Sequence, residues 1–121
     1  MRRPSRRCSR RPGVVARDGE VVVGAAAVEP LGEAGLLRSV VVEGSLRGTG
    51  LGRALVAAAE ELALERGIRE LFLLTETAAG WFPRLGYHVV PREEARAAVG
   101  ESIEFTMVCA VSGVPMRRTL G

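Results

Sequence analysis

The stretch that decides the fold is VEGSLRGTGLGR, residues 42–53, a glycine-dense turn between two apolar segments. Before it stands SVVV, residues 39–42, a β-branched run that is typical of a strand. After it, apolar residues recur at intervals of three and four with glutamates among them, which predicts an amphipathic helix over about residues 50–66. Gly67 suits the C-terminal cap of this helix.

The start of this helix is suited to an anion. Its first turn leaves backbone N–H groups without internal partners, at the positive end of the helix dipole. Gly48, Gly50 and Gly52 remove the Cβ atoms that would keep a phosphate away, and Arg47 and Arg53 can add charge-assisted contacts. The alternative is a merely flexible turn, but such turns seldom lead directly into so regular a helix.

Two well-known phosphate loops do not fit this stretch. A Walker A loop ends in Gly-Lys-Ser/Thr, and the chain has no lysine. A G-x-G-x-x-G fingerprint could begin at Gly48 and Gly50, but Arg53 occupies the place of its third glycine. The pattern that fits is R-x-x-G-x-G, met by Arg47, Gly50 and Gly52.

Residues 35–87, GLLRSVVVEGSLRGTGLGRALVAAAEELALERGIRELFLLTETAAGWFPRLGY, resemble the GNAT superfamily of acetyl-coenzyme A-dependent N-acyltransferases. They match its strand, pyrophosphate loop, helix, strand, helix and closing Gly-aromatic pair. Within the superfamily the chain looks most like the arsenic-resistance N-acetyltransferases, on the segments GLLRS, LLTETAAGWFPRLGY and FTMVCAVSGVPMRR. The resemblance covers about residues 14–120 and implies an α/β fold with a mixed central sheet flanked by helices.

The remaining segments supply the other elements of such a sheet. Asp18-Gly19 between two β-rich runs predicts an antiparallel hairpin of residues 14–17 and 20–28. A strand over 35–42, the helix and a strand over 70–75 predict a crossover between parallel neighbours. Further along we expect a short helix in 78–85 that Pro83 limits, a strand over 87–90, a helix over 92–99 and a last strand over 114–118.

The N-terminal residues differ from the rest of the chain. Residues 1–11 hold six arginines, so we expect a disordered basic tail over 1–13 and a GNAT domain over 14–121. The superfamily opens with a strand and one or two helices over the acceptor site, and here only the arginine-rich tail precedes the hairpin. The resemblance therefore implies an N-terminally truncated domain or a misassigned start, with a natural short form as the alternative. An uncovered apolar face of the sheet predicts a homodimer or poor solubility.

Composition limits the classes of partner. The 121 residues carry a net charge of +3, but residues 12–121 hold 11 arginines against 14 acidic groups. A mildly acidic folded part does not favour nucleic acid, although the tail could touch polyanions. No apolar stretch fits a secretion signal or a membrane span, so we expect a cytoplasmic protein. Two cysteines and one histidine are too few for a zinc site, and we expect no metal.

The resemblance also assigns places to the coenzyme. The strand before the loop parts from the strand after the helix, and the backbone of Val40, Val41 and Val42 would hold the pantetheine arm in the notch and polarise the thioester carbonyl. Thr75 could contact coenzyme or acceptor. The diphosphate of acetyl-CoA would lie on a loop of seven residues: Arg47, Gly48, Thr49, Gly50, Leu51, Gly52 and Arg53.

Candidates for proton transfer are few. Glu76, after the second parallel strand, is the candidate base for the amine, with a solvated surface carboxylate as the alternative. Phe82 occupies the position where many GNAT enzymes carry the tyrosine that protonates the departing thiolate. Tyr87, the only tyrosine, is the candidate replacement, although its position matches an aromatic that packs in the core. Arg38 could pair with an acidic acceptor, and Cys109 could bind arsenic or pack in the core.

The resulting hypothesis is an enzyme that transfers an acetyl group from acetyl-CoA to the amine of a small molecule, with a possible link to arsenic resistance. Two alternatives remain open. One is a non-catalytic acyl-CoA-binding or regulatory module, and the other is an inactive truncated fragment. Both are motivated by Phe82 and by the short segment before the hairpin.

Overall fold

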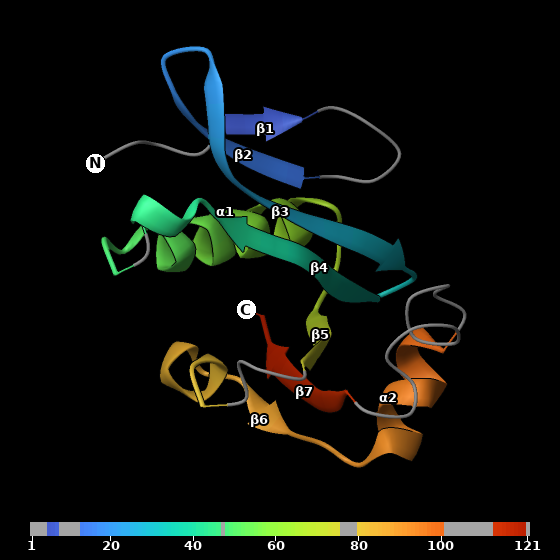
Figure 1. The fold of residues 1–121 in the computed structure, drawn as a ribbon. Helices are drawn as coiled ribbons and strands as arrows, with labels where there is room; N and C mark the ends of the chain where they lie inside the picture. The colour runs from blue at the N-terminus through green and yellow to red at the C-terminus, as the bar shows by residue number, and fades with distance from the viewer. Residues whose placement is uncertain (1–4, 8–12, 47, 76–79, 101–112, 121) are drawn as a thin grey trace.

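The structure is a computed structural model that describes residues 5–7, 13–46, 48–75, 80–100 and 113–120 (Figure 1). These residues form one seven-stranded sheet in the order β1-β2-β3-β4-β5-β7-β6, with a helix on each face. The helices are α1 (Leu51–Glu65) and α2 (Arg92–Val99). The strands are β1 (Ser5–Arg7), β2 (Gly13–Asp18), β3 (Val21–Leu31), β4 (Ala34–Val42), β5 (Glu70–Thr75), β6 (His88–Val89) and β7 (Val114–Thr119).

Strands β2, β3 and β4 form an antiparallel meander. The β2–β3 turn is the predicted hairpin, in which Asp18 pairs with Val21 across a two-residue loop. The β3–β4 turn follows the pair of Leu31 and Ala34. The interpretation of the Asp18-Gly19 signal is thereby confirmed.

The crossover from β4 through α1 to β5 joins parallel neighbours, as predicted. Pairing between these two strands runs only from Ala34 with Glu70 to Leu36 with Phe72. Strand β5 pairs along its whole length with β7 on its other side, in antiparallel register. The sheet is therefore mixed, and β4 continues beyond its last pair with β5.

Two apolar clusters cover the two faces of the sheet. Helix α1 turns Leu51, Leu55, Val56, Ala59 and Leu62 onto β2, β3 and β4 in the larger cluster. Helix α2 packs Ala95 and Val99 against Leu36 and Phe72 on the other face. The C-terminal end of β4 lies beside the first turn of α1, on the left in Figure 1.

The segment predicted to be a disordered tail contains an element that the sequence does not predict. Ser5–Arg7 forms β1, paired antiparallel with β2 from Ser5 with Val15 to Arg7 with Gly13. The open edge of β2 offers a row of main-chain donors and acceptors, and pairing with it does not depend on apolar side chains. Gly13, the last residue of this segment, begins β2, and the remaining residues of the segment lie outside the described residues.

Two elements are shorter than expected. The helix predicted within 78–85 is a 3₁₀ turn, η2 (Phe82–Leu85), and residues 76–79 lie outside the described residues. The strand expected over 87–90 is β6, His88–Val89. Pro83 lies in the first turn of η2, where proline is tolerated because the N–H that it lacks has no partner within the helix. In the described part of the chain, every helix is too short or too polar to cross a bilayer.

The face of the sheet opposite α1 carries exposed valines. Val40 and Val42 pack toward α1, so Val41 between them points to the other face, where it is 58% exposed. Val21, Val22 and Val89 are the other large exposed β-branched residues of the described strands. The homodimer stays a prediction that these side chains motivate.

Candidate functional site

A bulge in β4 opens the sheet. Across the β3–β4 ladder, Ala25 pairs with Val41 and Ala27 pairs with Arg38, so Ala26 faces two residues of β4, Ser39 and Val40. A bulge of this kind bends its strand and increases the local twist. The bend follows the point at which β4 stops pairing with β5. Among the described residues, no strand pairs with the β5-facing edge of β4 beyond Leu36.

A cavity of about 780 Å³ lies at this opening. Three segments line it: the end of β4, the loop and first turn of α1, and the start of η2. Figure 1 shows these three segments on the same side of the molecule. A volume of this size accommodates a drug-sized ligand. The lining residues are Val40, Val41, Val42, Gly48, Gly50, Gly52, Arg53, Trp81 and Phe82.

The loop before α1 has the backbone geometry expected of an anion cradle. Gly48 and Gly50 have φ angles of 83° and 86°, in the left-handed region that glycine adopts readily. Helix α1 starts at Leu51 without a capping side chain and without an acidic residue in its first turn. Among the described residues, no side chain caps its N-terminal amides, and Gly50, Gly52 and Arg53 at this helix start line the cavity.

Thr49 stabilises the loop from within. Its backbone N–H and its hydroxyl both donate to the carbonyl of Leu46, at 3.3 and 2.5 Å. Leu46 closes the short 3₁₀ turn η1 (Gly44–Leu46), which follows β4. Thr49 is predicted to contact the coenzyme. Because its hydroxyl proton is used in the bond to Leu46, we assign it the role of holding the loop in shape.

Trp81 and Phe82 form the aromatic wall of the cavity. The indole of Trp81 lies against the start of α1, where a Cβ built on Gly52 would be 3.4 Å from the ring. Its ring meets that of Phe82 edge to face, with centroids 4.9 Å apart. Phe82 is 6% exposed and carries no proton donor. Among the described lining residues, only Arg53 has an ionisable side chain.

Tyr87 lies in the core, and the described cavity lining does not include it. It is 2% exposed, and its hydroxyl donates to Oε2 of Glu60 at 2.8 Å. Burial, followed by the charge and hydrogen bond of Glu60, raises the pKa of Tyr87, while Arg118 opposes the shift. Proton transfer from this phenol to a thiolate, whose ordinary pKa is about 8.5, is therefore uphill.

The raised pKa of Tyr87 predicts a loss of stability at alkaline pH. An unfolded tyrosine ionises at about pH 10, whereas the folded one keeps its proton to higher pH. Tyr87 thus stabilises the fold fully below about pH 10, and this stabilisation declines as the pH rises further. The chain has one tyrosine, so tyrosinate absorbance reports Tyr87 alone.

We expect native protein to show tyrosinate absorbance only well above pH 10, and its unfolding temperature to fall steeply between about pH 10 and 12. Tyr87→Phe should reduce that fall. A native absorbance change centred near the ordinary pKa of about 10 would contradict the assignment.

The other candidate residues are placed as follows. Thr75 is buried at the end of β5, opposite Val114 of β7, and the described cavity lining does not include it. Nη1 of Arg38 lies 3.1 Å from Oε1 of Glu29 on β3, so Arg38 forms an ion pair within the sheet. Arg47, Glu76 and Cys109 lie outside the described residues. Their predicted roles stay predictions.

Sequence reasoning missed three features of the site. It did not identify Trp81 as part of the wall, although this residue directly precedes Phe82. It did not find the bulge at Ser39 and Val40, because the bulge is defined by the register of β4 against β3. It also did not connect Glu60 with Tyr87, which are 27 residues apart in sequence.

Comparison with known proteins identifies the family. Residues 10–89, more than half of the chain, match the family model of the acetyltransferase (GNAT) domain. The chain belongs to the GNAT acetyltransferase family. Its mixed sheet with flanking helices confirms the predicted fold class.

Two curated relatives match parts of the chain. Over 57 residues it is 40% identical to an uncharacterised N-acetyltransferase of Chlorobaculum tepidum. This match covers 47% of the present chain and 36% of the relative. Over 81 residues the chain is 36% identical to a predicted acetyltransferase of Bacillus subtilis. This match covers 66% of the present chain and 55% of the relative. The matched part of the chain thus spans about half or less of these relatives.

A solved structure shows the same fold. This is N-acetylglutamate synthase from Neisseria gonorrhoeae, complexed with coenzyme A and N-acetyl-glutamate. The TM-score is 0.78 at 20% identity, over 90% of this chain and 26% of that one. At this level of identity the likeness concerns the fold.

Proposed function

We propose that this protein binds acetyl-CoA in the cavity at the end of β4 and transfers the acetyl group to the amine of a small molecule. The observation that carries the proposal is the parting of β4 from β5 after Leu36, next to a helix start without a side-chain cap. An extended ligand arm and a diphosphate need these two features side by side. Membership of the GNAT family and the coenzyme A in the Neisseria structure support the same ligand.

The residues present fit the coenzyme. The diphosphate suits the N-terminal amides of Leu51, Gly52 and Arg53, because φ-positive Gly48 and Gly50 bring the main chain to the cavity without side chains. Arg53 adds a positive charge at the same place. Arg47 and Thr49 complete the loop that the sequence predicts for this role.

The pantetheine arm suits the open edge of β4. Main-chain donors and acceptors of Val40, Val41 and Val42 lie on a strand edge that β5 does not pair. An amide of this edge can bind the thioester oxygen and stabilise the charge that develops there during transfer. The apolar side chains of Phe82 and Trp81 limit the access of water to the same end of the cavity.

The chemistry requires two proton movements. The amine nitrogen attacks the thioester carbonyl carbon, the C–N bond forms, and the C–S bond breaks with the electron pair leaving on sulfur. The attacking nitrogen loses a proton, for which Glu76 is the candidate base. Because Phe82 has no proton to give and Tyr87 is engaged with Glu60, water protonates the departing thiolate.

Two measurements test this proposal. Calorimetry with acetyl-CoA should show saturable binding, and thiol release with a panel of small amines should show turnover for at least one of them. Binding without thiol release for any amine would favour a non-catalytic acyl-CoA-binding module. Absence of binding would contradict the proposed site and favour an inactive fragment.

The finer proposal, a link to arsenic resistance, rests on the resemblance of residues 35–39, 73–87 and 105–118. Much of the third segment, including Cys109, lies outside the described residues. An amine-bearing organoarsenical in the panel tests this link. Turnover of ordinary amines in preference to it would count against arsenic as the biological substrate.

A further inference from the structure

We propose that Glu60 is a positioning residue of the coenzyme cavity, which acts by holding Tyr87 and, through it, the aromatic wall of Phe82 and Trp81. Glu60 itself does not line the large cavity. The proposal rests on the proposed function, because the cavity it concerns is the one assigned to acetyl-CoA.

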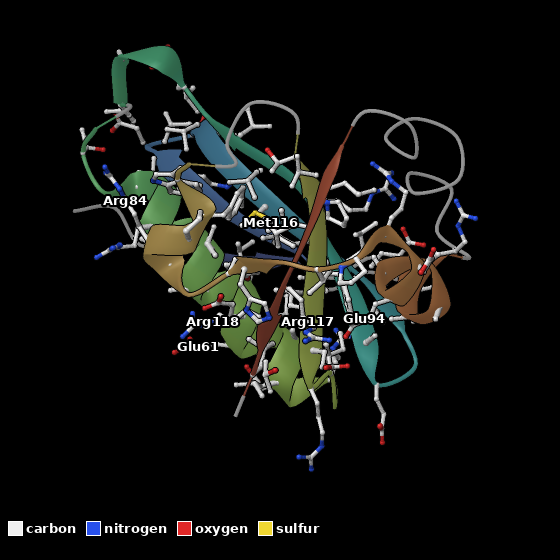
Figure 2. The ribbon with its side chains drawn as sticks, turned by 90° about the horizontal axis from the view of Figure 1, so that it is seen from below. Glu61, Arg84, Glu94, Met116, Arg117 and Arg118 are labelled. Atoms are coloured by element: carbon white, nitrogen blue, oxygen red, sulfur yellow. The ribbon has the colours of Figure 1, made fainter. Side chains whose placement is uncertain are left out.

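Glu60 is a largely buried acid that accepts hydrogen bonds from two side chains. It lies on the inner side of α1, and its side chain is 12% exposed. Nη1 of Arg118 on β7 donates to Oε1 and Oε2 at 2.9 and 3.0 Å, and the hydroxyl of Tyr87 donates to Oε2 at 2.8 Å. Figure 2 shows Arg118 on β7 close to α1. Donors of this kind replace the water that a largely buried carboxylate loses.

Both donors touch the segment that forms the cavity wall. Tyr87 follows Gly86, the C-cap of η2, and its N–H donates to the carbonyl of Phe82 at 3.3 Å. Arg118 lies over the residue that ends η2, since a Cβ built on Gly86 would be 3.1 Å from Nε. Glu60 therefore fixes the segment from Phe82 to Tyr87 against α1 at two points.

A row of three rings joins this anchor to the cavity. Tyr87 meets Phe82 edge to face, at 5.5 Å between centroids and 72° between planes. Phe82 meets Trp81 in the same manner, at 4.9 Å and 68°. Edge-to-face pairs have a preferred geometry, so a shift of the first ring displaces the others. The last two rings line the cavity.

The state of Tyr87 agrees with this role. Burial and Glu60 raise the pKa of Tyr87, so its hydroxyl keeps the proton that it donates. Removing the carboxylate would leave a phenol that is 2% exposed without its acceptor. Because Arg118 is 40% exposed, water can solvate it, and the loss would fall mainly on Tyr87.

The experiment compares Glu60→Gln with Glu61→Gln, an exposed neighbour on the same helix (Figure 2). Glu60→Gln replaces one charged acceptor oxygen by an NH₂ group, so the Tyr87 hydroxyl and Arg118 can no longer both donate to a carboxylate, and both contacts lose their charge assistance. Trp81 is the only tryptophan, so its emission reports the wall directly. We expect Glu60→Gln to shift this emission and to weaken coenzyme A binding about tenfold, and Glu61→Gln to change neither.

Two further variants separate positioning from stability. Val99→Ala removes buried methyl groups in the α2 cluster, on the other face of the sheet, and should lower the unfolding temperature without changing affinity or emission. Tyr87→Phe retains the Glu60–Arg118 pair and should produce a smaller loss of affinity in the same direction as Glu60→Gln. It provides the test if Glu60→Gln does not fold.

Unchanged emission and affinity in folded Glu60→Gln, or in Tyr87→Phe if Glu60→Gln does not fold, would overturn the positioning role. The proposed function fails separately, when the wild-type protein itself binds no coenzyme A. In that case the Trp81 emission of ligand-free Glu60→Gln, compared with that of the ligand-free wild-type protein, still decides whether Glu60 positions the wall.

Discussion

We expect Gly50→Glu to reduce coenzyme A binding about a hundredfold or more, because it places a carboxylate at the helix start where the diphosphate is proposed to lie. The side chain would stand at the N-cap of α1, beside the cavity that Gly50 lines. Its charge would bind the free amides and repel the ligand. Calorimetry with coenzyme A measures the loss.

A matched control removes the contribution of backbone strain. Gly50 has a φ angle of 86°, so any side chain at this position is strained. Gly19, in the β2–β3 turn, has a φ angle of 64° and open space around a built Cβ. Gly19→Glu therefore adds the same charge with a similar strain at a turn that the described cavity lining does not include. Equal loss of affinity in both variants would contradict the helix start as the anion site.

The second prediction is a gain of activity in Phe82→Tyr. The ring of Phe82 lines the cavity, and a phenol in its place brings a proton donor to the departing thiolate. We expect turnover to rise about tenfold below the ordinary thiol pKa of about 8.5, where the departing sulfur ends as a protonated thiol. The gain should shrink at higher pH, where the sulfur leaves as a stable thiolate. Thiol-release assays over a range of pH values measure the effect.

Phe82→Leu is the control for this substitution. It replaces the ring with another apolar group that has no proton to donate, so it should not raise turnover at any pH. It also removes the edge-to-face contacts with Trp81 and Tyr87, and a modest loss is expected. A gain in Phe82→Leu, or none in Phe82→Tyr near neutral pH, would place thiolate protonation elsewhere.

The sequence predicts elements well where local signals agree. Helix α2 and strand β5 have the bounds expected from their polar and apolar patterns. The hairpin at Asp18-Gly19 depends on a turn whose chemistry involves neighbouring residues alone. The start of α1 at Leu51 follows directly from the glycines before it.

What the sequence does not predict depends on contacts between distant segments. Strand β1 forms on the open edge of β2, although its three residues are Ser-Arg-Arg. The bulge at Ser39 and Val40 is defined only by the register of β4 against β3. The ion pair of Glu60 with Arg118 joins residues 58 positions apart. Such features need the assembled sheet.

The candidate site divides in the same way. The loop glycines and the three valines of β4 were identified from the local motif and the family resemblance, and they line one cavity. Tyr87 could not be separated from the catalytic candidates by sequence, because its hydrogen-bond partner lies on another element. Trp81 joins the site because its indole reaches the start of α1 across the fold.

The most direct test of the account is the response of backbone amides to coenzyme A, measured by heteronuclear NMR on isotope-labelled protein. If coenzyme A binds at the end of β4 and the start of α1, the largest shifts fall on Val40, Val41 and Val42 and on the amides from Gly48 to Arg53, with little change in α2. Largest shifts in α2 or β6, with the loop and the end of β4 unmoved, would contradict it.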